Sequence, residues 1–233
     1  MKNITKYLFF SMLLSILFYC SCNKATDYKK YFDGHEIIYP GIVNNLIAAG
    51  GNNRALLYWN PSPDPTVTKY IIYWNNKSDS LVVNATTSNP RDTVKVLIGS
   101  LSELSIYNFI VYSFDSSGNK SIPVNVNNVR IYGTYYNSTL RNRLDSGFKH
   151  STLTIYDTIF WRRPDTVNVN TLIRYTNTSN VVTSINLGPT QNLSRLINYK
   201  VGTYVYYKSS YKPLTNSPDT FYVSKFDSLL IAK

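Results

Sequence analysis

The longest β-like run in the chain is Ile106-Tyr107-Asn108-Phe109-Ile110-Val111-Tyr112-Ser113-Phe114. Tyr107, Phe109 and Val111 recur at period two, the spacing of side chains on one face of a β-strand. The turn sequence Asp115-Ser116-Ser117-Gly118-Asn119 follows at once and indicates a hairpin. Leu101 lies six residues before Tyr107. This layout resembles a tyrosine corner, in which a buried ring directs its hydroxyl group to nearby backbone.

Strand-like segments lie on both sides of this run and are separated by turn residues. They cover residues 55–59, 69–74, 80–83, 93–98 and 124–131. Three prolines within residues 61–65 are incompatible with a central strand and indicate a stiff loop. About seven short strands in under 100 residues are typical of an immunoglobulin-like sandwich. Trp59 and Tyr107 are expected in its core, and the corner favours the fibronectin type III variant.

The second half of the chain is also predicted to be mainly β. Strand candidates cover residues 152–161, 167–175, 181–187, 201–207 and 220–226, after a helical turn at 140–144. Val205 and Tyr207 share one face of the fourth candidate. The predicted fold class is all-β, with a fibronectin type III-like (immunoglobulin-like) β-sandwich followed by a second mainly-β domain.

The N-terminus resembles a bacterial lipoprotein signal. A basic start is followed by an apolar stretch, residues 7–20, that is too short for a confident membrane span. A small residue, Ser21, precedes Cys22, so Cys22 is the expected lipidation site. We therefore expect a signal peptide at 1–21, a tether at 22–36, the fibronectin-like domain at 37–133 and the second domain at 134–233.

The residue types disfavour catalysis and metal binding. The 233 residues include only two Cys and two His, and neither a P-loop nor a G-x-S-x-G elbow is present. His150 stands beside Ser151, and Asp157 and Asp165 flank Trp161, but each pattern is weak as a catalytic signature. We therefore expect no enzymatic activity, no cofactor and no metal.

Positive charge is concentrated in the second half. Residues 22–133 hold ten basic and eight acidic residues, a net charge of +2, whereas residues 134–233 hold twelve and five, a net charge of +7. A basic surface attracts polyanions. An envelope location argues against nucleic acid, so the expected polyanion is an anionic polysaccharide or the phosphate groups of lipopolysaccharide. Alternatively, the basic charge only keeps the domain soluble.

Candidate ligand-binding residues lie in that basic half. Trp161 precedes Arg162 and Arg163, so a ring that could stack stands beside two guanidinium groups that could bind carboxylate or phosphate. Tyr135 and Tyr207 are further candidates. Alternatively, Leu153, Ile155, Ile159 and Trp161 form one inward stripe, in which case Trp161 is a core residue.

Several short motifs, in their order, resemble an uncharacterised lipoprotein family of Bacteroidetes with an N-terminal fibronectin-like domain. The resemblance covers roughly residues 28–226 and rests on the segments Gly34-His35-Glu36-Ile37-Ile38-Tyr39-Pro40-Gly41, Trp59-Asn60, Asp64-Pro65, Tyr73-Trp74-Asn75-Asn76, Phe114-Asp115-Ser116-Ser117-Gly118-Asn119, Tyr206-Tyr207-Lys208-Ser209-Ser210-Tyr211-Lys212-Pro213 and Asp219-Thr220-Phe221-Tyr222.

The resemblance implies an accessory lipoprotein of a starch-utilisation-type system, anchored by lipid at the outer membrane on either the cell surface or the periplasmic face. The expected function is a binding module for glycan capture. The alternatives are a protein-interaction or assembly subunit of an outer-membrane complex and, less favoured, a glycan hydrolase.

Overall fold

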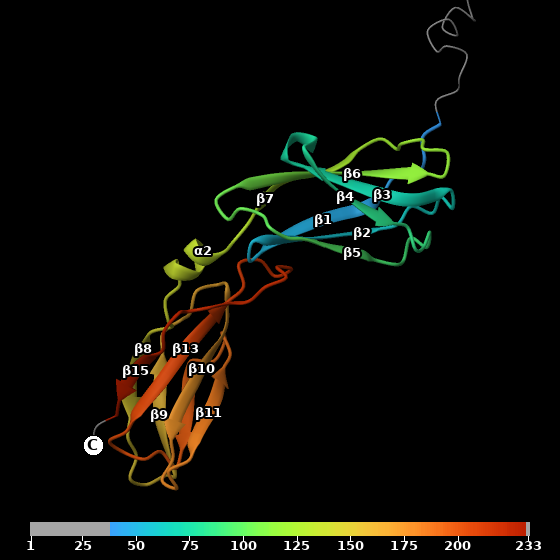
Figure 1. Ribbon diagram of the computed structural model, residues 1–233. Coiled ribbons are helices and arrows are strands. Elements are labelled where there is room, and N and C mark those ends of the chain that lie inside the picture. The colour runs from blue at the N-terminus through green and yellow to red at the C-terminus, as the bar shows by residue number, and fades with distance from the viewer. Residues whose placement is uncertain (1–37, 232–233) are drawn as a thin grey trace, which may run out of the picture. The chain divides into compact units, whose positions relative to one another are not determined.

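The computed structural model describes residues 38–231. The chain divides into two units, Met1–Tyr39 and Pro40–Lys233. The signal peptide, Cys22 and the whole of the expected tether lie outside the described residues. The second unit contains four antiparallel sheets, which form two sandwiches in sequence order (Figure 1). The predicted all-β fold class is confirmed.

The first sandwich packs a three-stranded sheet on a four-stranded sheet. In the order of hydrogen bonding, the strands are β1 (Asn44–Gly51), β2 (Arg54–Asn60) and β5 (Val94–Ile98), and then β4 (Asp79–Asn84), β3 (Val67–Trp74), β6 (Ile106–Asp115) and β7 (Val124–Arg130). A 3₁₀ turn, Asn75–Lys77, joins β3 to β4.

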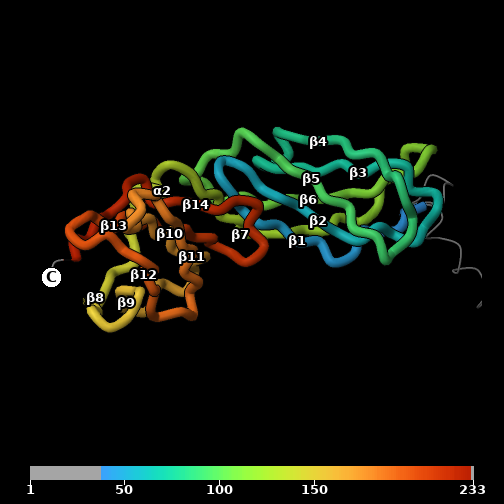
Figure 2. The backbone as a smooth tube through the Cα atoms, turned by 90° about the horizontal axis from the view of Figure 1, so that it is seen from below, coloured from blue at the N-terminus to red at the C-terminus, as the bar shows by residue number. Residues whose placement is uncertain are grey.

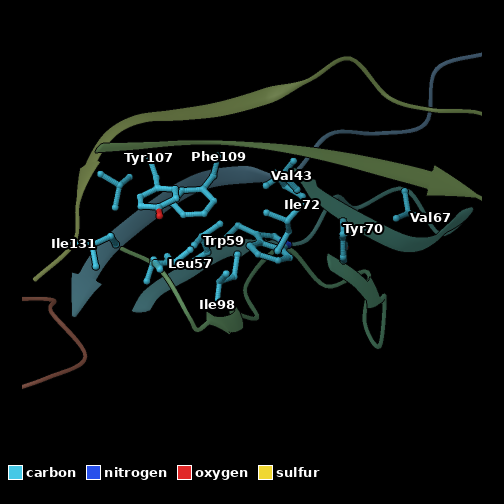
Figure 3. Close-up of a cluster of buried hydrophobic side chains, with 14 residues drawn as sticks. Val43, Leu57, Trp59, Val67, Tyr70, Ile72, Ile98, Tyr107, Phe109 and Ile131 are labelled. Carbon is cyan, nitrogen blue, oxygen red and sulfur yellow. The ribbon is translucent and has the colours of Figure 1, made fainter. Parts of the chain in front are cut away.

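The core of this sandwich is built from the side chains that alternate inward. Trp59 of β2 is buried and meets Tyr70 of β3 edge to face, with ring centroids 5.3 Å apart (Figure 3). Tyr107 is also buried, and its hydroxyl oxygen accepts a hydrogen bond of 2.9 Å from the backbone N–H of Ser102. The predicted tyrosine corner is therefore present.

The second sandwich also has two sheets. In the order of hydrogen bonding, the strands are β12 (Leu193–Ile197), β9 (Tyr156–Trp161) and β8 (Asp145–Lys149), and then β11 (Val182–Leu187), β10 (Asn168–Thr176), β13 (Tyr204–Tyr211) and β14 (Phe221–Tyr222), with β15 (Asp227–Leu230) also paired to β13. Figure 2 shows the path of β12 beside β9. Its core includes Ile159, Ile173 and Val205.

Four strands are absent from the sequence-based prediction, and each lacks a clear alternating apolar pattern. They are β1, β8, β12 and β15. β1 ends in small residues because its backbone runs close to other chain segments: a Cβ atom on Gly50 would lie 1.8 Å from the carbonyl oxygen of Arg130. The periodicity that marks a strand is therefore absent where close backbone approach requires glycine.

The predicted position of the helical turn was wrong. The helical segment is α2 (Thr134–Thr139), not residues 140–144. Its first backbone N–H groups, at Tyr135 and Tyr136, donate to the Glu103 carboxylate at 2.8 and 2.5 Å. This distant acid satisfies groups that a helix start leaves unpaired, and no local sequence pattern reveals it.

The predicted inward stripe is also only partly correct. Ile159 and Trp161 are buried, but Leu153 and Ile155 are exposed because β9 begins at Tyr156. The preceding residues form a turn in which the Ser151 hydroxyl oxygen accepts hydrogen bonds from the backbone of Leu153 and Thr154. This side-chain bonding competes with strand pairing.

Polar contacts connect the loop after β13 with the β1–β2 hairpin. The Asp219 carboxylate accepts hydrogen bonds from both Nε and Nη2 of Arg54, and from the backbone N–H of Asn52 at 2.8 Å. The Ser217 hydroxyl group donates to the carbonyl oxygen of Gly50, also at 2.8 Å. Residues more than 160 positions apart in the sequence are thereby joined.

We predict that Asp219→Asn lowers the free energy of unfolding at pH 7 by about 1 kcal/mol, the scale of a well-aligned, partly buried ion pair. The hydrogen bond from Arg54 is the main cause that holds the pKa of Asp219 below its usual range. A carboxylate with a lowered folded-state pKa stabilises the fold above its unfolded pKa of about 4, and loses that effect as the pH falls through the folded value.

Urea unfolding at pH 7 and pH 3 measures this effect. The difference between wild type and Asp219→Asn should shrink at pH 3, and exposed Asp227→Asn serves as the control with little change at either pH. An Asp219→Asn deficit that is equally large at both pH values would contradict the prediction.

Candidate functional site

Two of the predicted ligand-binding aromatics are core residues. Trp161 on β9 is 3% exposed, and its ring meets that of Tyr207 on β13 edge to face at 5.0 Å. The indole N–H of Trp161 donates to the Ser194 hydroxyl oxygen at 3.0 Å. Burial raises the pKa of Tyr207 to about 12. Both residues occupy inward positions of their strands, so neither Trp161 nor Tyr207 offers the exposed ring face that the ligand-binding prediction requires.

Tyr135, by contrast, is 63% exposed on α2. It lies outside the hollows described below, so the structure does not bring it together with the predicted arginines. Its neighbour Tyr136 is less exposed and contacts Tyr132 and Phe221 edge to face, with ring centroids 4.9 and 5.1 Å apart. Adjacent side chains point in different directions at the start of α2, so Tyr135 and Tyr136 have different environments.

Arg162 and Arg163 are exposed immediately after the end of β9. They line a hollow of about 640 Å³ that also includes the chain leading into β8. We call this hollow the arginine groove and define it by Tyr136, Arg141, Arg143, Arg162, Arg163, Asp165, Tyr211 and Asp227. The paired arginines that the sequence indicated thus meet two further arginines from the segment after α2.

A second hollow lies over the outer face of the larger sheet of this sandwich. We call it the tyrosine face; its volume is about 380 Å³, and it is lined by Arg174, Tyr175, Thr176, Val182, Tyr204, Tyr206 and Phe226. Tyr204 and Tyr206 are 51% and 48% exposed on β13, with ring centroids 6.3 Å apart and planes inclined at 40°. Arg174 of β10 is the strand partner of Tyr206.

The alternation of side chains along β13 is a signal for the tyrosine face that is present in the sequence. If Val205 and Tyr207 point inward, period two places Tyr204 and Tyr206 outward. Arg174 could not be added from sequence alone, because it reaches this face through the pairing of β10 with β13. Its guanidinium carbon lies 5.1 Å from the centre of the Phe226 ring, a cation–π contact.

His150 forms a polar cluster with a buried carboxylate. Its Nδ1 atom lies 2.8 Å from Oδ1 of Asp157, which also accepts the backbone N–H of Ser151 at 2.9 Å. The Ser151 hydroxyl oxygen accepts backbone N–H groups of its own turn. His150 and Ser151, which form a weak catalytic pattern in the sequence, thus belong to a hydrogen-bonded turn that Asp157 stabilises.

Residues 38–231 contain no group of three or more His, Cys, Asp and Glu side chains placed to hold a metal ion. Within the same residues, no helix has the length and apolar character needed to cross a bilayer.

The comparison with protein families gives one match. A model described as a domain of unknown function, DUF4998, matches residues 22–221. The chain belongs to the DUF4998 family. This agrees with the predicted resemblance to an uncharacterised family that has a fibronectin-like domain, whereas the bacterial group and the lipoprotein character stay predictions. No match was found among curated proteins.

Among solved structures, tandem fibronectin type III segments are similar to this DUF4998 chain. The FN1–FN3 domains of chicken CNTN1 show 16% identity and a TM-score of 0.46, covering 83% of this chain and 66% of that one. A two-domain segment of chicken tenascin shows 10% identity and a TM-score of 0.31, with 81% and 99% covered. The central array of RIM-binding protein shows 15% identity and a TM-score of 0.31, with 85% and 63% covered.

We predict that Trp161→Ala lowers the free energy of unfolding by about 3–5 kcal/mol, because it removes a large ring from the core. Arg163→Gln changes an exposed side chain and should alter stability by less than about 0.5 kcal/mol. Urea unfolding of both variants at pH 7 measures the contrast. A small loss for Trp161→Ala would mean that the ring does not pack between the sheets.

Proposed function

We propose that this DUF4998 protein is a non-enzymatic lipoprotein of the cell envelope that captures a glycan, and that the tyrosine face is its sugar-binding surface. The observation that carries the proposal is the exposure of Tyr204 and Tyr206 side by side on one strand, beside the arginine of the neighbouring strand. The glycan-capture role itself is what the family resemblance implies.

The chemistry of the tyrosine face suits a sugar. Exposed aromatic rings offer apolar surface to the C–H face of a pyranose, and each phenol group keeps a polar end that can hydrogen-bond. Adjacent outward positions on β13 place two such rings along the strand, so that successive residues of a chain-like ligand could meet successive rings. The hollow between the rings and Val182 gives the concave shape expected of a ligand site.

Arg174 adds a restrained hydrogen-bond donor to the tyrosine face. Phe226 contacts its guanidinium group through the cation–π interaction, and Lys208 lies over the same ring at 5.5 Å. A guanidinium group restrained in this way presents its remaining N–H donors at a fixed place, at a smaller entropic cost on binding. Ring stacking together with a fixed donor can select both the plane and the orientation of a sugar.

Membrane attachment through Cys22 is the second part of the proposal. The support is the basic start, the short apolar stretch and the small residue before the cysteine. More than one acyl chain anchors a protein stably, whereas a single chain is marginal. Attachment at the outer membrane would keep the binding surface at the envelope, where a captured glycan is useful.

The glycan prediction is tested with the full chain in a nonionic detergent on a glycan array, followed by calorimetry of the best ligand. We expect Tyr204→Ala and Tyr206→Ala each to weaken binding by about tenfold or more, the effect of losing one aromatic stacking contact. Tyr135→Ala is the matched control, an exposed tyrosine outside the hollow. Absence of any glycan ligand, or equal losses for Tyr135→Ala, would refute the assignment.

Lipidation is tested by growth with labelled palmitate. We expect label in the wild-type chain and none in Cys22→Ala, since only the cysteine thiol at the cleavage site accepts the lipid. Cys20→Ala is the control and should still be labelled. Label that persists in Cys22→Ala would contradict the assignment.

A further inference from the structure

Arg143 is a buried cation without an acidic partner. It is 4% exposed, although it lines the arginine groove. Its Nε atom donates to the carbonyl oxygen of Arg162 at 2.6 Å, and Nη1 donates to that of Gly188 at 3.4 Å. Among the described residues, Nη2 has no hydrogen-bond partner, and no carboxylate oxygen lies within 4 Å of this guanidinium group.

Such an arrangement is costly for the fold. A buried charge is normally paired, because removal of its hydration shell is repaid only by an opposite charge and good hydrogen bonds. Burial lowers the pKa of Arg143, which reflects this destabilised charge. Arginine nevertheless stays protonated in proteins, so a positive charge remains at the base of the groove.

Other charges in the groove leave that cation uncompensated. Three more arginines line it, Arg141, Arg162 and Arg163, against two acids, Asp165 and Asp227. The Oδ1 atom of Asp165 accepts hydrogen bonds from the Thr166 hydroxyl group and the Val167 backbone N–H in its own turn, at 3.3 and 3.2 Å. The formal charge of the groove is therefore +2.

We propose that the arginine groove is an oxyanion receptor, with Arg143 fixed at its base and Arg162 and Arg163 as exposed arms. The ligand group is a carboxylate or a phosphate, such as the charged group of an acidic sugar. Two guanidinium groups can each bind such a group through two parallel N–H donors. This receptor uses residues separate from the tyrosine face, so the inference stands whether or not that face binds sugar.

The geometry also predicts distinct roles for the arginines. Arg143 is restrained by two backbone carbonyl groups, so little side-chain entropy is lost when an anion binds to it. Arg162 and Arg163 are exposed and project from the segment that follows β9. They should contribute long-range attraction that salt screens, whereas the contact with buried Arg143 should be screened much less.

The test uses calorimetry of the full chain in a nonionic detergent with three probes: inorganic phosphate, galacturonate and neutral galactose. We expect phosphate or galacturonate to bind and galactose not to bind at the groove. The double variant Arg162→Gln/Arg163→Gln should weaken anion binding by about tenfold or more, because charge-assisted hydrogen bonds are lost. Tighter binding of galacturonate would identify a carboxylate ligand, and tighter binding of phosphate a phosphoryl ligand.

The matched control is Arg195→Gln, which removes an exposed arginine that lies over Tyr156 elsewhere on the same sandwich. Its anion affinity should equal that of the wild type. Arg143→Lys keeps the positive charge but lacks the planar guanidinium group with its paired N–H donors. A variant that still folds should therefore bind the anion more weakly. Failure of both anions to bind, or equal losses in Arg195→Gln, would overturn the proposal. Loss of neutral-glycan binding in the tyrosine variants alone would leave it intact.

Discussion

The contact between Trp161 and Tyr207 is the interaction on which the second sandwich depends. It joins the smaller sheet to the larger one through an edge-to-face pair at the centre of the core. Because side chains alternate along β13, the inward position of Tyr207 requires Tyr204 and Tyr206 to point outward. The same packing that stabilises the domain therefore also sets out the aromatic surface proposed for sugar.

The two candidate sites of this domain have different physical origins. The tyrosine face follows from strand alternation, with a contribution from the neighbouring strand through Arg174. The arginine groove depends on irregular chain: residues after α2, after β9 and at the start of β15 converge on it. A sheet face is rigid and suits stacking, whereas loops with several long cations can surround a charged group.

The first sandwich uses the same construction. Trp59 and Tyr70 fill its core, and the tyrosine corner restrains the chain before β6. Its polar contacts with the later chain are specific: Asp219 meets Arg54, and Glu103 caps α2. These acids come from loops, where hydrogen bonds to distant backbone groups can form without disturbing a ladder.

The sequence by itself determined the fold class, the strand periodicity and the burial of Trp59 and Tyr107, because alternation and turn residues are local properties of the chain. It also indicated that the basic half carries the charged candidates Arg162 and Arg163. It could not place β1, β8, β12 or β15, where small or polar residues obscure the alternation.

Only the tertiary structure decided which aromatic residues face solvent and which arginines meet. Trp161 and Arg162 are adjacent in sequence, yet one is a core residue and the other lines a groove, because the strand ends between them. Arg143 has no distinctive sequence context. Its burial beside Arg162 arises from the packing of separate segments, and this long-range arrangement is a property that no local pattern encodes.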